Sequence, residues 1–263
     1  MTQYKELSIL KWYNAQGVDE VISNNTRTYL KKKDSSEISH LKAPIIKQPT
    51  KYISPNNATK LAKQIADTCT SISELKTAVE KFDGCVLKKT ATNTVFSDGN
   101  PDSKVMLIGE APGANEDLQG VPFCGESGKL LDKVLKSIGL DRKENLYITN
   151  SIFWRPPGNR KPTDEEIRCC LPFVEKHIGL MKPNLIILAG SVAASTLFGN
   201  LGPISKQRQK IFKYKNEYLD QEISTVIIYH PSYLLRQPSQ KKLAWYDMLF
   251  IKDILGSTIP SMK

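Results

Sequence analysis

Three side chains that can do chemistry stand at the ends of short apolar runs. A carboxylate (Glu110), an amide (Asn150) and an imidazole (His230) each follow a mostly apolar run of the length expected for a buried strand. Ligands of open α/β sheets bind beyond the carboxyl ends of parallel strands, so we expect the three groups to converge on one crevice. Each alone has an ordinary explanation, because Asn is a common turn former and a single His is commonly structural. Their convergence favours a functional site.

The loop that begins at Gly109 is the feature around which we expect the chain to be organised. It has the sequence Gly109-Glu-Ala-Pro-Gly113 and continues to Phe123, before a helical pattern begins near Gly128. A strand, a glycine loop and a helix in succession commonly form a site, because glycine lets the backbone approach a ligand and adopt positive φ. The alternative is an ordinary turn with a solvated Glu110.

Alternating apolar runs and helical patterns predict the sheet that would bring these groups together. The expected strands are Val105–Ile108, Leu146–Thr149, Leu185–Ala189 and Thr225–Tyr229. The helical patterns lie at Gly128–Ile138, Thr163–Met181, Val192–Phe198 and Lys241–Leu255. Apolar runs separated by helices are typical of a parallel sheet covered on both faces, so the predicted fold class is α/β.

Two of these helical patterns carry further detail. Thr163-x-x-Glu166 is a capping box, which predicts a helix start at this point. In the last helix we expect the large apolar side chains to point towards the core, namely Leu243, Trp245, Tyr246, Leu249 and Phe250.

The first part of the chain differs in composition from the rest. Residues 1–33 have a helical pattern and are expected to form a helical N-terminal extension. Residues 34–58 are rich in Ser, Pro, Lys, Thr and Asn, which predicts a flexible linker. A helical period returns at residues 59–82, so we expect the main domain to span residues 59–263.

Composition limits the classes to which the chain can belong. Of its 263 residues 40% are hydrophobic, and 37 Lys and Arg against 27 Asp and Glu give a charge of +10. This charge favours a polyanionic partner, although solvated lysines would give the same balance. No apolar run is long enough for a membrane span, and the first residues lack a signal-peptide pattern. The five cysteines have no disulfide spacing, so we expect reduced thiols and a cytoplasmic protein.

Five motifs occur in an order that is typical of one enzyme family. They are Gly109-Glu-Ala-Pro-Gly113, Pro122-Phe-x-Gly125-x-x-Gly128-x-Leu-Leu131, Tyr147-Ile-Thr-Asn150, Arg155-Pro-Pro-Gly-Asn-Arg160 and His230-Pro-Ser-Tyr-Leu-Leu-Arg236. Over roughly residues 82–254 the chain resembles the family 4 (type-4) uracil-DNA glycosylases. The resemblance implies a three-layer α/β/α sandwich with a central parallel four-stranded sheet, and the removal of uracil from DNA in base-excision repair.

The resemblance implies roles for the glycine loop. Glu110 resembles the glutamate of the family's uracil pocket, and Gly109 and Ala111 beside it would contact the base. From its chemistry alone Glu110 could position the attacking water, counter positive charge on the sugar, or only brace the loop. Phe123 resembles the aromatic residue that stacks on the base, a contact worth roughly 1–3 kcal/mol. Core packing beside Pro122 would explain Phe123 equally well.

Asn150 and His230 are expected to recognise the base and to assist its departure. Asn150 resembles the amide that binds the uracil edge. One carboxamide pairs with both the N3–H donor and the O4 acceptor of uracil, whereas cytosine presents the opposite pattern. His230 resembles the histidine that stabilises the leaving base. Breaking the glycosidic bond places negative charge on uracil O2, and a hydrogen bond from His230 would stabilise that anion.

The residues expected to contact DNA lie in two motifs. Those that resemble the loop pressed into DNA at the flipped nucleotide are Ser232, Leu234, Leu235 and Arg236. This loop would combine an apolar wedge with a phosphate anchor, although its leucines could instead cap the core. Arg155 and Arg160 belong to a stiff basic loop after the second strand. We interpret them as DNA-backbone contacts, with a solvated loop as the alternative.

The cysteines depart from the family pattern. Members typically carry four cysteines that bind a [4Fe–4S] cluster. By alignment of the neighbouring motif residues, Cys85 and Cys170 match two of these positions, whereas Phe82 and Trp154 occupy the other two. Two thiolates cannot hold a cubane in the normal way, so we expect no cofactor and no metal. The hypothesis is that the two aromatic rings fill the cluster volume, and a bound cluster is the disfavoured alternative.

Other interpretations are less consistent with the residues present. A related covalent-trapping glycosylase group carries a His-containing insertion that the loop Phe153–Pro162 lacks. A non-catalytic DNA-binding or polymerase-associated module would lack Glu110, Asn150 or His230, and all three are present. A nucleotide-binding protein has no support, since neither GxGxxG nor a P-loop occurs. We therefore expect a monomeric, monofunctional uracil-DNA glycosylase whose partner is uracil-containing DNA.

Overall fold

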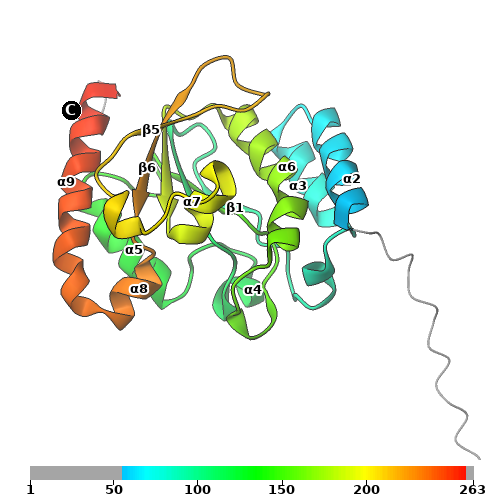
Figure 1. Ribbon diagram of the computed structural model, residues 1–263, viewed down its shortest axis with the longest axis horizontal. Helices are drawn as coiled ribbons and strands as arrows, with labels where there is room; N and C mark the ends of the chain where they lie inside the picture. Colours follow the sequence, from blue (N-terminus) through cyan, green and yellow to red (C-terminus); the bar gives the residue numbers. More distant parts are fainter. Residues whose placement is uncertain (1–54, 259–263) are drawn as a thin grey trace, which may run out of the picture. The chain divides into compact units, whose positions relative to one another are not determined.

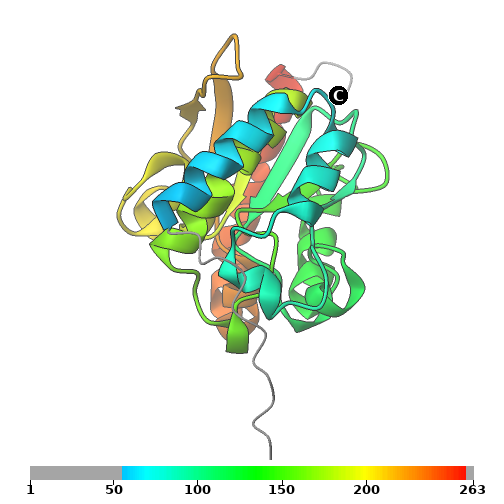
Figure 2. The ribbon, with the colours of Figure 1, turned by 90° about the vertical axis from the view of Figure 1, so that its right-hand side faces the viewer.

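The computed structural model describes residues 55–258, which form a sheet with helices on both faces (Figures 1 and 2). The predictions for residues 1–33, and for residues 34–54 of the linker, lie outside the described residues. Helix α2 begins at Pro55, so residues 55–58 are helical and the linker predicted there was wrong. A proline is well accommodated in a first helical turn, where its missing N–H has no partner to lose.

The four predicted strands form the centre of the sheet. They are β3 (Tyr147–Asn150), β2 (Val105–Gly109), β4 (Leu185–Ala189) and β6 (Ile223–Ile228), in this spatial order. Each neighbouring pair among them is parallel, which confirms the arrangement predicted from the apolar runs. The carboxyl ends of these strands therefore lie along one edge of the sheet.

Two further strands correct the predicted four-stranded sheet. β1 (Ser97–Gly99) and β5 (Phe212–Tyr214) pair antiparallel with β3 and β6, so the sheet is six-stranded and mixed. Each edge strand has only three residues and lacks a continuous apolar run, so hydrophobic periodicity gave no signal for either.

The sheet separates two hydrophobic cores. On one face lie α2 (Pro55–Thr68), α3 (Ile72–Lys81) and α6 (Asp164–Met181), and on the other α5 (Glu126–Lys136) and α9 (Lys241–Thr258). Alternate residues of β2 point into different cores, because side chains alternate across a strand. Met106 and Ile108 pack with the first group of helices, whereas Val105 and Leu107 pack with the second. The three-layer α/β/α sandwich is therefore confirmed.

The remaining helical segments are short. They are η2 (Val86–Lys89), α4 (Ala114–Gln119), η3 (Pro157–Asn159), α7 (Ser191–Phe198), η4 (Ile204–Lys206), α8 (Pro231–Arg236) and η5 (Pro238–Gln240). The predicted capping box is confirmed at the start of α6, where Thr163 Oγ1 accepts from the Glu166 N–H at 3.3 Å and Glu166 Oε2 accepts from the Thr163 N–H at 2.8 Å. Within residues 55–258 no helix is long and apolar enough to cross a membrane.

The orientation predicted for the last helix was wrong. In α9 the side chains of Leu243, Trp245, Tyr246 and Leu249 are exposed, and only Phe250 of the predicted set packs against the core. The buried face consists of Ala244, Asp247, Met248, Ile251, Ile254 and Leu255. Both faces of this helix carry apolar side chains, so hydrophobicity alone could not identify the inner one.

Candidate active site

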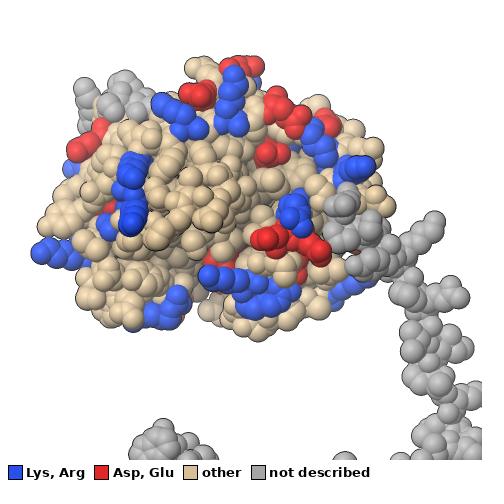
Figure 3. Space-filling view, in the orientation of Figure 1, with Lys and Arg blue, Asp and Glu red and all other residues tan. Residues whose placement is uncertain are grey.

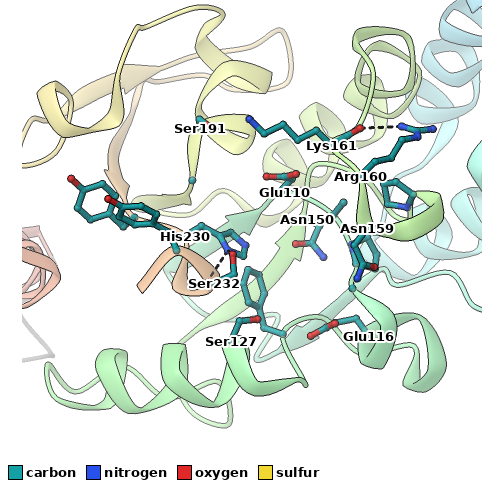
Figure 4. A pocket seen from close by; sticks show the side chains of 18 of the residues that line it. Glu110, Glu116, Ser127, Asn150, Asn159, Arg160, Lys161, Ser191, His230 and Ser232 are labelled. Atoms are coloured by element: carbon teal, nitrogen blue, oxygen red, sulfur yellow. Dashed lines mark hydrogen bonds between the residues drawn. The ribbon is translucent and has the colours of Figure 1, made fainter. Parts of the chain in front are cut away.

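A cavity of about 610 Å³ opens at the carboxyl edge of the central strands. Glu110 follows β2, Asn150 ends β3, and His230 precedes α8, and all three side chains line this cavity (Figure 4). The predicted convergence of carboxylate, amide and imidazole is therefore present. Ala111 and Phe123 also line the cavity, as expected of the glycine loop.

Asn150 presents an unpaired polar atom at this site. Its side chain is 2% exposed, and its Oδ1 has no hydrogen-bond partner among the described residues. The space beside it exists because residue 109 is a glycine. A Cβ at Gly109 would lie 2.4 Å from Asn150 Oδ1 and 2.5 Å from Phe123 Cζ. Gly109 does not line the cavity itself, and its contribution is to let the amide and the ring approach each other.

Phe123 is held in an unusual backbone conformation. Its φ is +52°, a left-handed value that costs a non-glycine residue about 1–2 kcal/mol. The turn also requires a glycine at 128, where a Cβ would lie 1.8 Å from the Phe123 carbonyl oxygen. The ring is buried, and its centroid lies 5.7 Å from that of the His230 imidazole with the planes tilted by 33°. The ring is therefore a fixed wall of the cavity beside the imidazole.

Arg142 fixes the loop that carries this ring. Its guanidinium donates to the carbonyl oxygens of Pro122 at 3.1 Å and Phe123 at 3.0 Å. It also forms ion pairs with Asp98 at 2.8 Å and Asp132 at 2.7 Å, so it ties the loop to β1 and α5. Five planar donors allow one guanidinium to hold several acceptors at once. Sequence reasoning missed Arg142, because it lies outside every motif.

His230 occupies the N-cap of α8, and this position determines its tautomer. Its Nδ1 accepts from the Ser232 backbone N–H at 3.2 Å and lies 2.8 Å from Ser232 Oγ. Because a backbone N–H can only donate, Nδ1 carries no proton, and the proton of the neutral ring is on Nε2. Burial and the charge of Arg236 lower the pKa of His230 to about 4. The histidine is therefore neutral near pH 7.

Two carboxylates at the cavity have different surroundings. Glu116 is buried, and its Oε1 accepts from the Gly125 N–H at 2.9 Å, so it braces the loop. Glu110 makes no side-chain hydrogen bond to any residue in the described part of the chain. Burial raises the pKa of Glu110, and the charges of Lys161 and Arg236 oppose this shift. Glu116 was not singled out from the sequence, because its partner is fixed only by the folded loop.

The basic residues at the cavity rim are not equivalent. Arg236 and Lys161 line the cavity, and Figure 4 shows the Lys161 side chain extending above Glu110. Arg160 also lines it, but its guanidinium donates to both oxygens of Glu166 at 2.9 and 2.6 Å. Arg160 therefore braces the capping box of α6 in this structure, and its predicted DNA contact stays a prediction. Arg155 donates to Asn159 at 2.7 Å and lies outside the cavity lining.

The two leucines of the predicted wedge also differ. Leu234 is 4% exposed and packs in an apolar hollow with Leu131, Ile228 and Met248, as in the alternative that it caps the core. Leu235 is 43% exposed. Successive residues of a helix point in different directions, so only one of the pair can face DNA.

Comparison with known proteins agrees with this geometry. Residues 96–252 match the model of the uracil DNA glycosylase superfamily. The type-4 uracil-DNA glycosylase of Archaeoglobus fulgidus is 37% identical over 182 residues, covering 68% of this chain and 90% of that protein. The type-4 enzyme of Saccharolobus solfataricus is 38% identical over 184 residues, covering 68% of this chain and 84% of that protein. The chain belongs to the type-4 uracil-DNA glycosylase family.

A relative of another kind bears on the alternative interpretation. The DNA polymerase of Bacillus phage SP01 is 27% identical over 168 residues, which cover 64% of this chain but only 17% of the polymerase. A segment similar to this chain therefore also occurs within a much longer DNA polymerase.

The two aromatic residues expected in place of cluster cysteines pack against each other. Phe82 and Trp154 are almost fully buried, with ring centroids 6.5 Å apart and planes 28° from parallel. Cys169 and Cys170 lie against Cys85, and hydrogen bonds from their thiols lower the pKa of Cys85. No group of three or more His, Cys, Asp or Glu residues within the described ranges is arranged to hold a metal ion. The residues present do not fit a four-cysteine cluster.

Proposed function

We propose that the cavity holds a uracil base flipped out of DNA and that this chain hydrolyses the bond between the base and its sugar. Uracil excision in DNA repair is the activity of the type-4 family, and the chain is an enzyme of that family. The observation that carries the assignment to this cavity is the buried, unpaired Oδ1 of Asn150, which lies in the same lining as His230. A buried polar atom without a partner costs about 1–3 kcal/mol, which a ligand that pairs with it would recover.

Asn150 is the proposed specificity residue. Its free Oδ1 would accept the N3–H of uracil, and its Nδ2 would donate to O4. Cytosine offers an acceptor at N3 and a donor at N4, so the same fixed amide would meet two mismatches. A site built to hydrogen-bond one substrate can reject an unmatched one by a factor of about 10⁴ or more.

His230 is the proposed stabiliser of the leaving base. Its neutral ring carries a proton on Nε2, because Nδ1 accepts from Ser232. A donor directed at uracil O2 would stabilise the negative charge that develops as the C1′–N1 bond breaks. The stabilisation is electrostatic and requires no net proton transfer from the ring. Ser232 thus acts as a positioning residue that fixes the tautomer.

Glu110 is proposed to act on the water and the sugar rather than on the loop. The bracing role falls to Glu116, and the Glu110 carboxylate makes no hydrogen bond within residues 55–258. An anion near the sugar would stabilise the positive charge of an oxocarbenium-like transition state. The water oxygen would then bond to C1′, the electron pair of the broken bond would leave with uracil, and the carboxylate would accept the proton of the water.

The rim of the cavity is proposed to hold the DNA in its unstacked form. Removing a base from the stack costs a few kcal/mol, which contacts to the distorted DNA must offset. Leu235, as the exposed member of the leucine pair, would fill the gap left by the base. Arg236 and Lys161, both at the cavity, would bind the neighbouring phosphates, and Arg155 would contact the backbone further away.

We also propose that the chain acts without an iron–sulfur cluster. The support is the buried aromatic pair Phe82 and Trp154, whose rings stack where cluster ligands would be required. Phe173 completes this packing, with its ring centroid 5.0 Å from that of Phe82. Anaerobically purified protein should contain no iron and show no visible absorbance band. Stoichiometric iron with such a band would contradict the proposal.

A cytoplasmic location and catalytic competence are proposed on separate grounds. All five cysteines are free of disulfides, which is typical of a reducing compartment.

The alternative of a non-catalytic, polymerase-associated module has some precedent in the phage polymerase. Such a module would not need Glu110, Asn150 and His230 at one cavity, and their presence together favours the enzyme.

Single-turnover kinetics on a short uracil-containing oligonucleotide test this proposal. The parent should excise uracil and leave thymine in the same sequence. Glu110→Ala and His230→Ala should each slow excision by about 10² or more, because each removes charge stabilisation of the transition state. Near-parent rates in both variants would refute the assigned roles. Absence of excision by the parent, with the fold intact by circular dichroism, would favour the non-catalytic module.

A further inference from the structure

The outer face of α9 carries an exposed apolar surface that is not part of the base cavity. The exposed fractions are 37% for Leu243, 48% for Trp245, 45% for Tyr246 and 40% for Leu249. The other exposed large apolar residues in the described part of the chain are spread singly over different elements, namely Leu61, Val86, Leu118, Ile211 and Leu235. Single exposed apolar residues are normal, whereas a contiguous patch marks a contact surface.

The spacing of residues along α9 shows how this surface is built. Lys242, Tyr246, Leu249 and Asp253 are four, three and four residues apart, so they form one stripe along the helix. Separations of three and four are those of the a and d positions that face a partner helix in a coiled coil. Figure 1 shows α9 at one side of the fold, and none of the other helices of residues 55–258 lies on its outer face.

Both flanks of the stripe add to the surface. Leu243 and Phe250 lie on one flank, beside a hollow of about 530 Å³ that is completed by Ser205, Arg208 and Gln209. Trp245 and Lys252 lie on the opposite flank, by the geometry of a helix with 3.6 residues per turn. The surface therefore has an apolar centre with a hollow at one side.

The arrangement of the stripe is complementary to itself. Tyr246 and Leu249 lie at equal distances on either side of its centre, and Lys242 and Asp253 do so at its two ends. If a second copy packed antiparallel, Tyr246 would meet the partner's Leu249, and Lys242 would meet the partner's Asp253. A two-fold axis would repeat both pairs. On the flanks Leu243 would meet the partner's Phe250, and Trp245 would meet the partner's Lys252 in a cation–π contact.

We propose that α9 is the contact surface of a symmetric dimer of this chain, in which two α9 helices pack antiparallel. The charges favour a second copy over DNA, because the stripe has one basic end, Lys242, and one acidic end, Asp253, and a uniformly anionic surface would match only the first. They favour it over a lipid surface for the same reason. The prediction of a monomer from the sequence did not take this surface into account, because the exposed apolar residues of α9 were expected to point into the core.

The size of the surface limits the strength of the dimer. Stable specific interfaces bury about 1,200–2,000 Å² in total, and one pair of helices of this length lies at or below the lower end. We therefore expect a dimer that dissociates in the micromolar range and not a permanent assembly. The stripe shares no residue with the lining of the base cavity, so a monomer would retain its active site.

Sedimentation velocity of the full chain, from about 1 to about 100 μM, tests the proposal. The parent should pass from one-chain to two-chain mass across this range. Leu249→Glu should weaken association at least about tenfold, because it places two like charges at the apolar centre. Leu61→Glu, at an exposed position of α2, is the matched control and should associate like the parent.

A charge exchange keeps the test informative should Leu249→Glu disturb the helix. Lys242→Asp and Asp253→Lys should each weaken association, because like charges then face each other across the two-fold axis. The two changes together should restore it. A parent that stays monomeric throughout, a Leu249→Glu variant that associates like the parent, or a double variant no better than the single ones would each overturn the proposal. A monomeric parent whose DNA affinity falls in Leu249→Glu would assign the stripe to DNA instead.

Discussion

At the scale of single residues, the site depends on two polar atoms whose states are fixed by their neighbours. The Oδ1 of Asn150 is free because no described residue donates to it, and the proton of His230 is on Nε2 because Ser232 donates to Nδ1. The sequence could indicate which residues meet, since strand ends converge. It could not indicate these states, because they depend on which donors folding places within about 3 Å of each atom, or leaves away from it.

The state of His230 gives a prediction for the pH dependence of excision. Burial lowers the pKa of this residue to about 4, so its ring is neutral throughout the range from pH 8 to pH 5. The single-turnover rate should therefore show no step with a midpoint near 6.5, the ordinary value for histidine. Loss of activity through His230 is expected only towards pH 4, where protonation of Nδ1 would oppose the N–H of Ser232. Protonation of Glu110, whose pKa is raised by burial, should give a separate fall in rate that remains in His230→Gln. A midpoint near 6.5 that disappears in His230→Gln would contradict the neutral donor.

At the scale of elements, the glycine loop and its supports make the pocket. Gly109 and Gly128 permit the close approaches, and Arg142 holds the turn at Phe123. The glycines lie in motifs and could be predicted, whereas Arg142 acts on the loop from about 20 residues along the chain and gave no signal. Similarly, the positive charge of Arg160 suggested a contact to DNA, but its guanidinium donates to the buried carboxylate of Glu166. The identity of a charged residue does not reveal its partner.

Gly109→Ala tests whether the close approach at this position matters for catalysis. The added Cβ would lie 2.4 Å from Asn150 Oδ1 and 2.5 Å from the Phe123 ring, so both must move. Excision should fall by about 10² or more, because displacements of about 1 Å have effects of this size. Gly256→Ala is the matched control, since nothing lies within 4 Å of a Cβ at that position. Equal activity of the two variants would show that the approach at Gly109 is not needed.

At the scale of the whole molecule, the apolar runs and helical periods were sufficient to predict the three-layer arrangement. The short edge strands and the orientation of α9 were not predictable, because the first are too short for a period and the second has apolar residues on both faces. The net charge of the chain is +10, and on the face that Figure 3 shows, basic side chains are dispersed among acidic ones. We therefore propose the cavity rim, rather than the overall charge, as the part that recognises DNA.

The stability of the fold should depend on pH through a buried histidine. His177 is fully buried, its Nε2 lies 2.8 Å from the Tyr147 hydroxyl, and burial lowers its pKa to about 3. A histidine whose pKa is lowered by folding stays neutral in the folded chain. In the unfolded chain the same imidazole takes up a proton below about pH 6.5. Its contribution is therefore present above that pH and is lost as the pH falls towards 3.

Urea unfolding between pH 7 and pH 5 checks this, because most carboxylates remain charged in that window. The parent should lose stability over the window, and His177→Phe should lose less, since it removes the proton uptake of the unfolded chain. Phe96, stacked on the imidazole at 4.5 Å between centroids, should accept the new ring. An unchanged slope in the variant would show that His177 does not control the acid sensitivity.

The central claim, that the amide of Asn150 recognises an extruded uracil, is tested most directly by the selectivity of Asn150→Asp. Single-turnover excision should be measured on otherwise identical oligonucleotides with uracil or cytosine at one position. Asn200→Asp serves as a control, because Asn200 uses only its Oδ1, which accepts from Gly202, and aspartate keeps that oxygen. Asn150→Asp should excise uracil more slowly than the parent by a factor of about 10² or more, and its preference for uracil over cytosine should be smaller. Asn200→Asp should match the parent in both rate and preference. Excision by Asn150→Asp at the parent rate and with the parent selectivity would contradict the claim.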